Sequence, residues 1–186
     1  AKVSSYITDR LGGRGNIVAV KFRQHFGCRR RGLVLDTVLS EYPEIKLLDE
    51  HEMPPTGFVE DTQATVETWL TRYGDEIDAI FCAFDDLSAA AALAIEAAGY
   101  TKDDIFVVGI DGTEQAYDMI RRGSPFVATV AQPFEEYARK AMEIVEEIIV
   151  NGKDPLKVTG GMPVIYLDAP LITEANVPAP GKTPFD

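Results

Sequence analysis

The segment IFVVGIDGT, residues 105–113, decides the fold class of this chain. Its first six residues form a nearly continuous apolar run, which is typical of a parallel strand covered on both faces. An alanine-rich helix is predicted before it, over residues 86–98, and Gly99 suits the left-handed turn that ends a helix. Another helix is predicted after it and ends at Gly123. A strand between two helices indicates a parallel sheet, because parallel strands need a crossover connection.

The same alternation extends toward both ends of the chain. Short apolar runs predict strands, and apolar side chains at three- and four-residue intervals predict helices. The prolines and glycines of residues 176–184 favour an irregular tail. The expected fold is therefore an α/β doubly wound parallel sheet flanked by helices. Strands are predicted at residues 16–22, 45–48, 77–83, 126–130 and 163–167, and helices at residues 1–7, 34–42, 60–73 and 134–150.

The charge of the chain argues against two classes of partner. Lysine and arginine number 18 against 30 aspartates and glutamates, a formal charge of −12 at pH 7. This excess repels nucleic acid backbones and anionic lipid surfaces. No apolar run approaches the roughly 20 residues that cross a bilayer, and the first residues lack the pattern of a secretory signal. Residues 1–7 resemble the middle of a helix, so we expect the chain to begin inside a longer protein.

Cysteine and histidine usage predicts neither a metal site nor a cofactor. Cys28 and Cys82 form no CxxC redox motif and no zinc-ligand cluster, and His25 and His51 do not complete one. We therefore interpret the cysteines as structural thiols. No Ser-His-Asp or Cys-His arrangement is evident, so the sequence does not predict an enzyme.

Polar and aromatic side chains follow the predicted strands at one edge of the sheet. In an open parallel sheet the ligand crevice lies outside the carboxyl ends of the strands. Phe84 and Asp85, Asp111 and Gln132 occupy such positions, and the arginine cluster at residues 29–31 follows the first strand. Carboxylates accept hydrogen bonds from hydroxyls, guanidinium groups donate them, and an aromatic ring covers the apolar face of a sugar. This set of side chains is suited to a sugar.

A series of short motifs is more specific than this inventory. The chain carries, in order, GRGN at 13–16, Arg29 three residues before Gly32, DAIF at 78–81 leading to Asp85, IFVVGIDGT at 105–113, Gly123, VATVAQP at 127–133 and LITEANV at 171–177. In order and spacing this series resembles the type I periplasmic sugar-binding proteins, in particular the ribose-binding branch of ABC transporter solute receptors. The resemblance spans nearly the whole chain.

The resemblance implies roles for individual residues. Arg29, Asp111 and Gln132 match positions whose side chains contact ligand hydroxyls in this family. Phe84 stands where many relatives have asparagine, which predicts a stacking contact in place of a polar one. Phe58 is the aromatic residue near the place where the family has an aromatic contact.

Asp85 is a further candidate with two interpretations. It precedes a predicted helix, so its carboxylate is expected to cap that helix. The alternative is that the carboxylate contacts the ligand. Arg30 and Arg31 are interpreted as solvated or paired on the surface.

The resemblance also implies that the chain is one lobe of a two-lobed protein. Residues 1–132 match the C-terminal lobe of the family. Residues 133–162 match a helix and crossover that would pack on a missing N-terminal lobe, and residues 163–186 match a return strand and irregular tail. The apolar stripe of the helix at 134–150 predicts that the chain on its own associates with itself or repacks this helix.

The function implied is binding without chemistry. We expect capture of a small sugar or polyol for delivery to the membrane permease of an ABC transporter, or for chemotaxis, in the periplasm or another extracytoplasmic compartment.

Two alternatives remain open at this point. The effector-binding domain of a lac-repressor-type regulator shares the fold and needs an N-terminal DNA-binding segment. A small α/β hydrolase or phosphotransferase would use Asp85, Asp86 or Asp111 as nucleophile or metal ligand. Such phosphoryl-transfer enzymes are expected to have an aspartate after the first strand, where this chain has Lys21-Phe22-Arg23.

Overall fold

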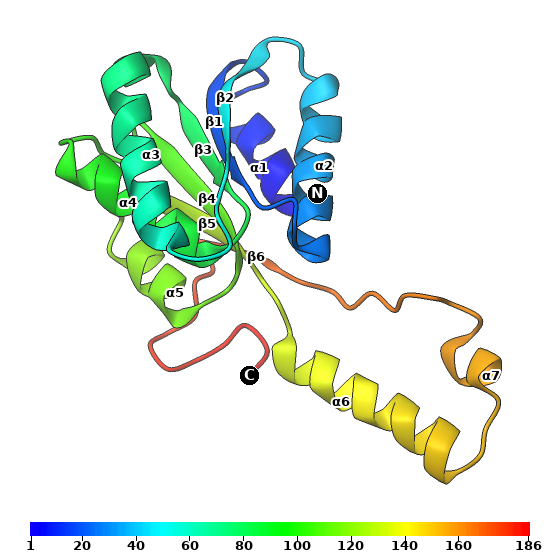
Figure 1. Cartoon of the computed structure of the whole chain (residues 1–186). Coiled ribbons are helices and arrows are strands. Elements are labelled where there is room, and N and C mark those ends of the chain that lie inside the picture. Colours follow the sequence, from blue (N-terminus) through cyan, green and yellow to red (C-terminus); the bar gives the residue numbers. More distant parts are fainter. The chain divides into compact units, whose positions relative to one another are not determined.

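A six-stranded sheet forms the centre of the larger of two units into which the chain divides (Figure 1). The computed structural model describes all of residues 1–186, with residues 1–131, 171–184 and 186 in the first unit and residues 132–170 and 185 in the second. The strand order is β2-β1-β3-β4-β5-β6. The strands are β1 (Gly15–Lys21), β2 (Ile45–Glu52), β3 (Ala79–Cys82), β4 (Phe106–Asp111), β5 (Phe126–Ala131) and β6 (Leu171–Thr173).

Five of these strands are parallel, which confirms the predicted α/β fold. Strands β2 to β5 are linked through parallel pairs, whereas β6 runs antiparallel to β5, with Val130 opposite Leu171. The chain leaves β1 toward β2 on one side and returns to β3 on the other. Ligands of open α/β sheets bind where the strand order reverses in this way. The topology therefore predicts a ligand site at the carboxyl ends of β1 and β3.

Helices cover both faces of the sheet because alternate residues of the buried strands point to opposite sides. Ile17 and Ala19 of β1 share a core with apolar side chains of α1 and α2. Val18 and Val20 share the other core with side chains of α3 and α4. The helices of this unit are α1 (Lys2–Arg10), α2 (Phe26–Ser40), α3 (Phe58–Tyr73), α4 (Asp85–Ala97) and α5 (Glu114–Arg121), with a short 3-10 turn over Gly74–Glu76.

One predicted strand is wrong. Residues 163–167 have no regular structure and are mostly exposed, and the last strand is instead β6, Leu171–Thr173. A strand needs a neighbour that satisfies its backbone groups. Leu171 to Thr173 have that neighbour in β5.

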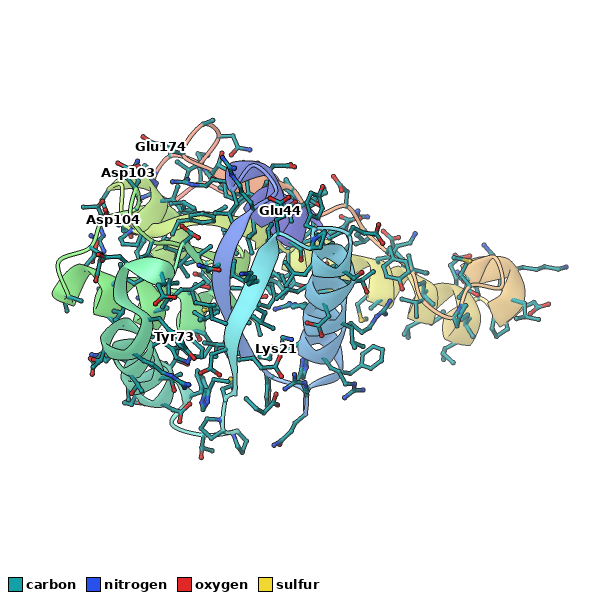
Figure 2. All side chains as sticks on the ribbon, turned by 90° about the horizontal axis from the view of Figure 1, so that it is seen from above. Lys21, Glu44, Tyr73, Asp103, Asp104 and Glu174 are labelled. Carbon is teal, nitrogen blue, oxygen red and sulfur yellow. The ribbon has the colours of Figure 1, made fainter.

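A buried lysine connects α2 to the sheet. Lys21, the last residue of β1, is 2% exposed, and its Nζ lies 2.6 Å from Asp36 Oδ1 on α2 and 2.7 Å from Glu50 Oε2 on β2. Figure 2 shows Lys21 between these two elements. The hydrogen bond from Lys21 holds the pKa of Glu50 below its usual range. The two ion pairs fix α2, whose first turn lies at the carboxyl edge of the sheet.

The second unit contains α6 (Phe134–Val145), a π-helical turn (Glu146–Val150) and α7 (Pro155–Thr159). The predicted helix at 134–150 is therefore α-helical only to Val145. Arg139 pairs with Glu136 and Glu143 on one side of α6. Large apolar side chains of this unit are exposed, namely Phe134, Met142, Val145, Ile149, Val150, Leu156, Met162, Val164, Ile165, Tyr166 and Phe185. None of the helices in the chain combines the length and hydropathy of a membrane crossing.

Candidate functional site

The carboxyl edge of the sheet gathers a carboxylate, guanidinium groups and aromatic rings. β1, β3 and β4 are consecutive in the sheet, so the residues that follow them are neighbours in space. α2 starts at Phe26 and α4 at Asp85, and both helices begin at this edge. Phe84 and Asp111 lie there as the sequence predicts.

Asp111 forms an ion pair at the end of β4. Its Oδ1 lies 3.0 Å from Nη2 of Arg31, whose Nη1 donates to the backbone oxygen of Ala83 at 2.6 Å. The two charged side chains are 22% and 19% exposed, so each can still meet a ligand. Arg31 thus links α2 with the ends of β3 and β4. Of the two interpretations of Arg31, solvated or paired, the structure shows the paired one, and the partner is the Asp111 carboxylate.

Arg29 lies at the same edge but is not joined to Asp111 by a direct ion pair. Its Nη1 donates to the backbone oxygen of Arg23 at 2.8 Å, which closes the loop between β1 and α2. Its guanidinium carbon lies 5.7 Å from the ring centroid of Phe26, a side chain that is 62% exposed. The exposed guanidinium of Arg29 and the Phe26 ring form one polar and aromatic surface at the start of α2.

Phe58 and Phe84 form an aromatic pair. Their ring centroids are 5.5 Å apart at an interplanar angle of 75°, the edge-to-face geometry that aromatic rings prefer. Both rings are half-buried and pack against the core on the α3 and α4 side. The two aromatic residues predicted from different parts of the sequence are therefore brought together.

Asp85 has a different environment from the one expected. It is 1% exposed, and its carboxylate accepts hydrogen bonds from the backbone of Gly112 and Thr113 and from the Thr129 hydroxyl. Phe84 occupies the N-cap position of α4, with no side-chain cap bond. Asp85 therefore neither caps its own helix nor presents free oxygens to a ligand, because both oxygens are used inside the fold.

Gln132 directly follows β5 and is the first residue of the second unit. Its backbone oxygen accepts the N–H of Phe134 at the start of α6. A ligand contact by its side chain remains a prediction.

The two cysteines are buried thiols without a disulfide. Burial raises the pKa of both Cys28 and Cys82, which keeps them protonated and unreactive.

A hollow lies at the opposite edge of the sheet. It has a volume of about 230 Å³ and lies between α1, the turns before β4 and β5, and the end of β6. Its charged groups satisfy one another: Lys102 pairs with Glu174 at 2.8 Å, and Arg10 donates to the backbone oxygen of Lys102 at 3.0 Å. Figure 2 shows Glu174 on this edge, with Asp103 and Asp104. The hollow lacks the aromatic pair of the carboxyl edge.

Sequence reasoning gave no individual role in the site to three residues that shape it. Arg31 pairs with Asp111, Thr129 donates to Asp85, and Phe26 exposes an aromatic ring. Thr129 carried a signal, since it is the one polar residue in the apolar run VATVA. The sequence held no signal that distinguishes Arg31 from the other two arginines of the triplet. Three adjacent residues of a helix point in different directions, and the sequence does not show which one faces Asp111.

Comparisons with known proteins agree with this architecture. A family model described as a periplasmic binding protein domain matches residues 3–154. The chain is 32% identical over 179 residues to a xylitol-binding protein from Mycolicibacterium smegmatis, covering 95% of this chain and 48% of that protein. It is 30% identical over 156 residues to the D-allose-binding periplasmic protein of Escherichia coli, covering 82% of this chain and 48% of that protein.

Solved structures show the same likeness. An ABC transporter solute-binding protein from Agrobacterium vitis, solved with bound allitol, superposes with a TM-score of 0.82 at 28% identity, over 95% of this chain and 59% of that one. An ABC sugar transporter subunit from Rhodobacter sphaeroides gives a TM-score of 0.83 at 26% identity, over 95% and 61%. The chain spans about half the length of the curated relatives it matches.

Proposed function

Because the chain belongs to the periplasmic binding protein family, we propose that it is one lobe of a receptor that binds a small sugar or polyol. The observation that carries the proposal is the Asp111 and Arg31 pair, partly open to solvent, at the sheet edge where ligands of such folds bind. The Phe58 and Phe84 pair at the same edge adds apolar surface. Relatives named for xylitol and allose, and a solved structure with bound allitol, support this ligand class.

We assign the ligand contacts as follows. Asp111 accepts hydrogen bonds from hydroxyl groups, Arg29 and Arg31 donate to oxygens, and Phe84 with Phe58 covers an apolar face. Gln132 is proposed to add an amide contact. Asp85 is left out because its oxygens are already bonded within the fold.

The remaining half of the site is proposed to come from a second lobe. The matched relatives are about twice as long as this chain, and one lobe supplies only part of the contacts to a ligand held between two. The partner of the complete receptor is proposed to be the membrane permease of an ABC transporter, in the periplasm or an equivalent extracytoplasmic space.

The relatives also weigh on the alternatives. They are named as sugar, polyol or import binding proteins, which supports a transport receptor over the effector domain of a repressor. The family consists of solute-binding proteins, which supports binding without catalysis. Asp85, offered above as a nucleophile, is buried and hydrogen-bonded on both oxygens.

Titration of sugars and polyols against the chain tests the proposal. We expect the amide resonances of residues 22–31, 84–85 and 111–113 to shift saturably with xylitol, allitol, D-allose or D-ribose. Because half of the contacts are absent, the dissociation constant is expected to be weaker than about 1 mM, a binding free energy of about −4 kcal/mol or less in magnitude. Nuclear magnetic resonance detects such weak binding, whereas calorimetry on the same sample is expected to show little heat.

Two results would contradict this proposal. Shifts that are absent for every polyhydroxylated ligand, or that fall at the opposite edge, would exclude the sugar site. Micromolar binding by the chain alone would contradict the half-site. Glycine betaine, an osmolyte without hydroxyl groups, serves as the control ligand.

We also propose that the exposed apolar side chains of the second unit cause self-association of the chain on its own. Met142 is 66% exposed and Ile149 is 75% exposed, which is unusual for side chains of this size. Light scattering over a concentration series is expected to give a mass above that of one chain, and Ile149→Lys is expected to reduce it. A monodisperse monomer with α6 still folded would disprove the association.

A further inference from the structure

Asp85 is a buried carboxylate at the junction of α4, β4 and β5. Its Oδ2 accepts the backbone N–H groups of Gly112 at 2.8 Å and Thr113 at 2.9 Å. Its Oδ1 accepts the hydroxyl of Thr129 at 2.7 Å. All three donors lie on β5 or on the turn after β4, and this turn begins at Asp111. One side chain therefore connects the start of α4 to the residue proposed to contact ligand.

We propose that Asp85 is a positioning residue whose negative charge holds the turn at residues 111–113 and sets the direction in which the Asp111 carboxylate is presented. The proposal rests on the proposed function only for its effect on sugar affinity, since the geometry of the turn does not depend on a ligand.

The turn needs such support because its backbone is strained. Asp111 has a φ of 151° and is the one non-glycine residue of the chain with positive φ, and Gly112 follows with a φ of 75°. A Cβ on Gly112 would lie 2.6 Å from the Ala131 Cα, so the turn is also closely packed. Conformations of this kind persist only where the surroundings over-determine them. Two hydrogen bonds to one buried carboxylate provide that constraint.

The charge on Asp85 is finely balanced. Burial raises its pKa to about 6, the hydrogen bonds from Thr113, Thr129 and Gly112 lower it, and the negative charge of Asp111 raises it. Of the groups around it, Arg31 is bonded to Asp111 instead. Burial raises the pKa values of Tyr117 and Cys82, and the charge of Asp85 raises them further. No positive charge is bonded to Asp85 itself. Its ionised form is stabilised by hydrogen bonds alone.

The sign of the stability effect follows from this raised pKa. In the unfolded chain an aspartate has a pKa of about 3.9. Because the pKa of Asp85 is raised to about 6 in the folded chain, the folded state binds this proton more tightly. The stabilising contribution of the protonated group is full below about 3.9 and is lost as the pH rises through about 6. Asp85 therefore costs folding stability in its charged form, although that form holds the turn better, because charge-assisted hydrogen bonds are roughly twice as strong as neutral ones.

Asp85→Asn is the direct test. Asparagine keeps the shape and one acceptor oxygen but carries no charge, so the variant is expected to fold at neutral pH without loss of stability. The amide protons of Gly112 and Thr113 are expected to move upfield, to exchange faster, and to lose their dependence on pH between about 5 and 8. Sugar affinity at about pH 8 is expected to fall about tenfold, to the level of the unmodified chain at about pH 5. Asp86→Asn, an exposed carboxylate in the same helical turn, is the matched control and should change none of these signals.

Thr129→Val provides a second variant that leaves Asp85 in place. The Thr129 hydroxyl stabilises the charged form, so its removal is expected to move the midpoint of the Gly112 amide titration to higher pH. A merely structural threonine would lower stability without moving this midpoint.

The outcomes separate this inference from the proposed function. Unchanged Gly112 and Thr113 amides in Asp85→Asn would overturn the positioning role. The positioning role would also be overturned if these amides change while the carboxyl carbon resonance of Asp111 and its dependence on pH stay the same. If no sugar binds the unmodified chain, the proposed function fails, and the amide and carboxyl signals still decide whether Asp85 orients Asp111.

Discussion

Asp111→Asn is expected to weaken sugar binding by about tenfold to a hundredfold, because a hydrogen bond to a charged acceptor contributes about 1.5–3 kcal/mol. Asparagine has nearly the same size and shape as aspartate, so the backbone at this position, with its φ of 151°, should remain as it is. Arg31 keeps its bond to the Ala83 backbone oxygen and stays ordered. The measurement is the ligand-dependent amide shift at residues 22–31 and 84–85, which should become unsaturable.

Asp103→Asn is the control for this substitution. It changes the net charge by the same amount, but Asp103 is exposed at the opposite edge of the sheet, where Figure 2 shows it near Glu174. Its sugar titration should equal that of the unmodified chain. Equal affinities for both variants would show that Asp111 makes no ligand contact.

Gly109→Ala is expected to destabilise the chain by about 3 kcal/mol or more, or to prevent folding, because it overpacks a closed part of the core. A Cβ at this position of β4 would lie 2.6 Å from Asp85 Oδ1, 2.9 Å from Phe126 Cζ, and closer still to Ser88 Oγ. The added methyl group would displace the Asp85 carboxylate from the turn it supports. Urea denaturation followed by circular dichroism measures the loss.

Gly32→Ala is the matched control. Gly32 lies inside α2, and a Cβ there would meet the Lys21 side chain at an ordinary distance of 3.5 Å. Alanine is a better helix former than glycine by about 1 kcal/mol, so this variant should be neutral or more stable. Similar losses for both glycines would show that the close packing around Gly109 is not what limits the substitution.

The fold was predictable because it follows from periodicity. Each buried strand is an apolar run and each helix has an apolar stripe, so residues 105–113 and their flanks sufficed to identify a parallel sheet. The strand predicted at 163–167 failed because an apolar run predicts a strand only where a partner edge is available. Periodicity does not report which edge is free.

The location of the site was predictable from the sequence, but the hydrogen bonds and ion pairs between its residues were not. The positions after β3 and β4 follow from the sheet topology, and Phe84 and Asp111 lie there. The predicted role of Asp85 as the cap of its helix was wrong. Its hydrogen-bond donors are Gly112, Thr113 and Thr129, which lie close to Asp85 only in the folded chain. The choice of Arg31 over Arg29 as partner of Asp111 depends on the rotation of α2 about its axis, which Lys21 and its ion pairs help to fix.

The antiparallel strand β6 has a mechanical consequence. The second unit leaves the sheet after Ala131 and returns at Leu171, and these exit and entry points lie on paired neighbouring strands, since Val130 is opposite Leu171. Both ends of residues 132–170 are thus attached to the same pair of strands, β5 and β6. The pairing of β5 with β6 therefore holds both ends of residues 132–170 at the same side of the sheet.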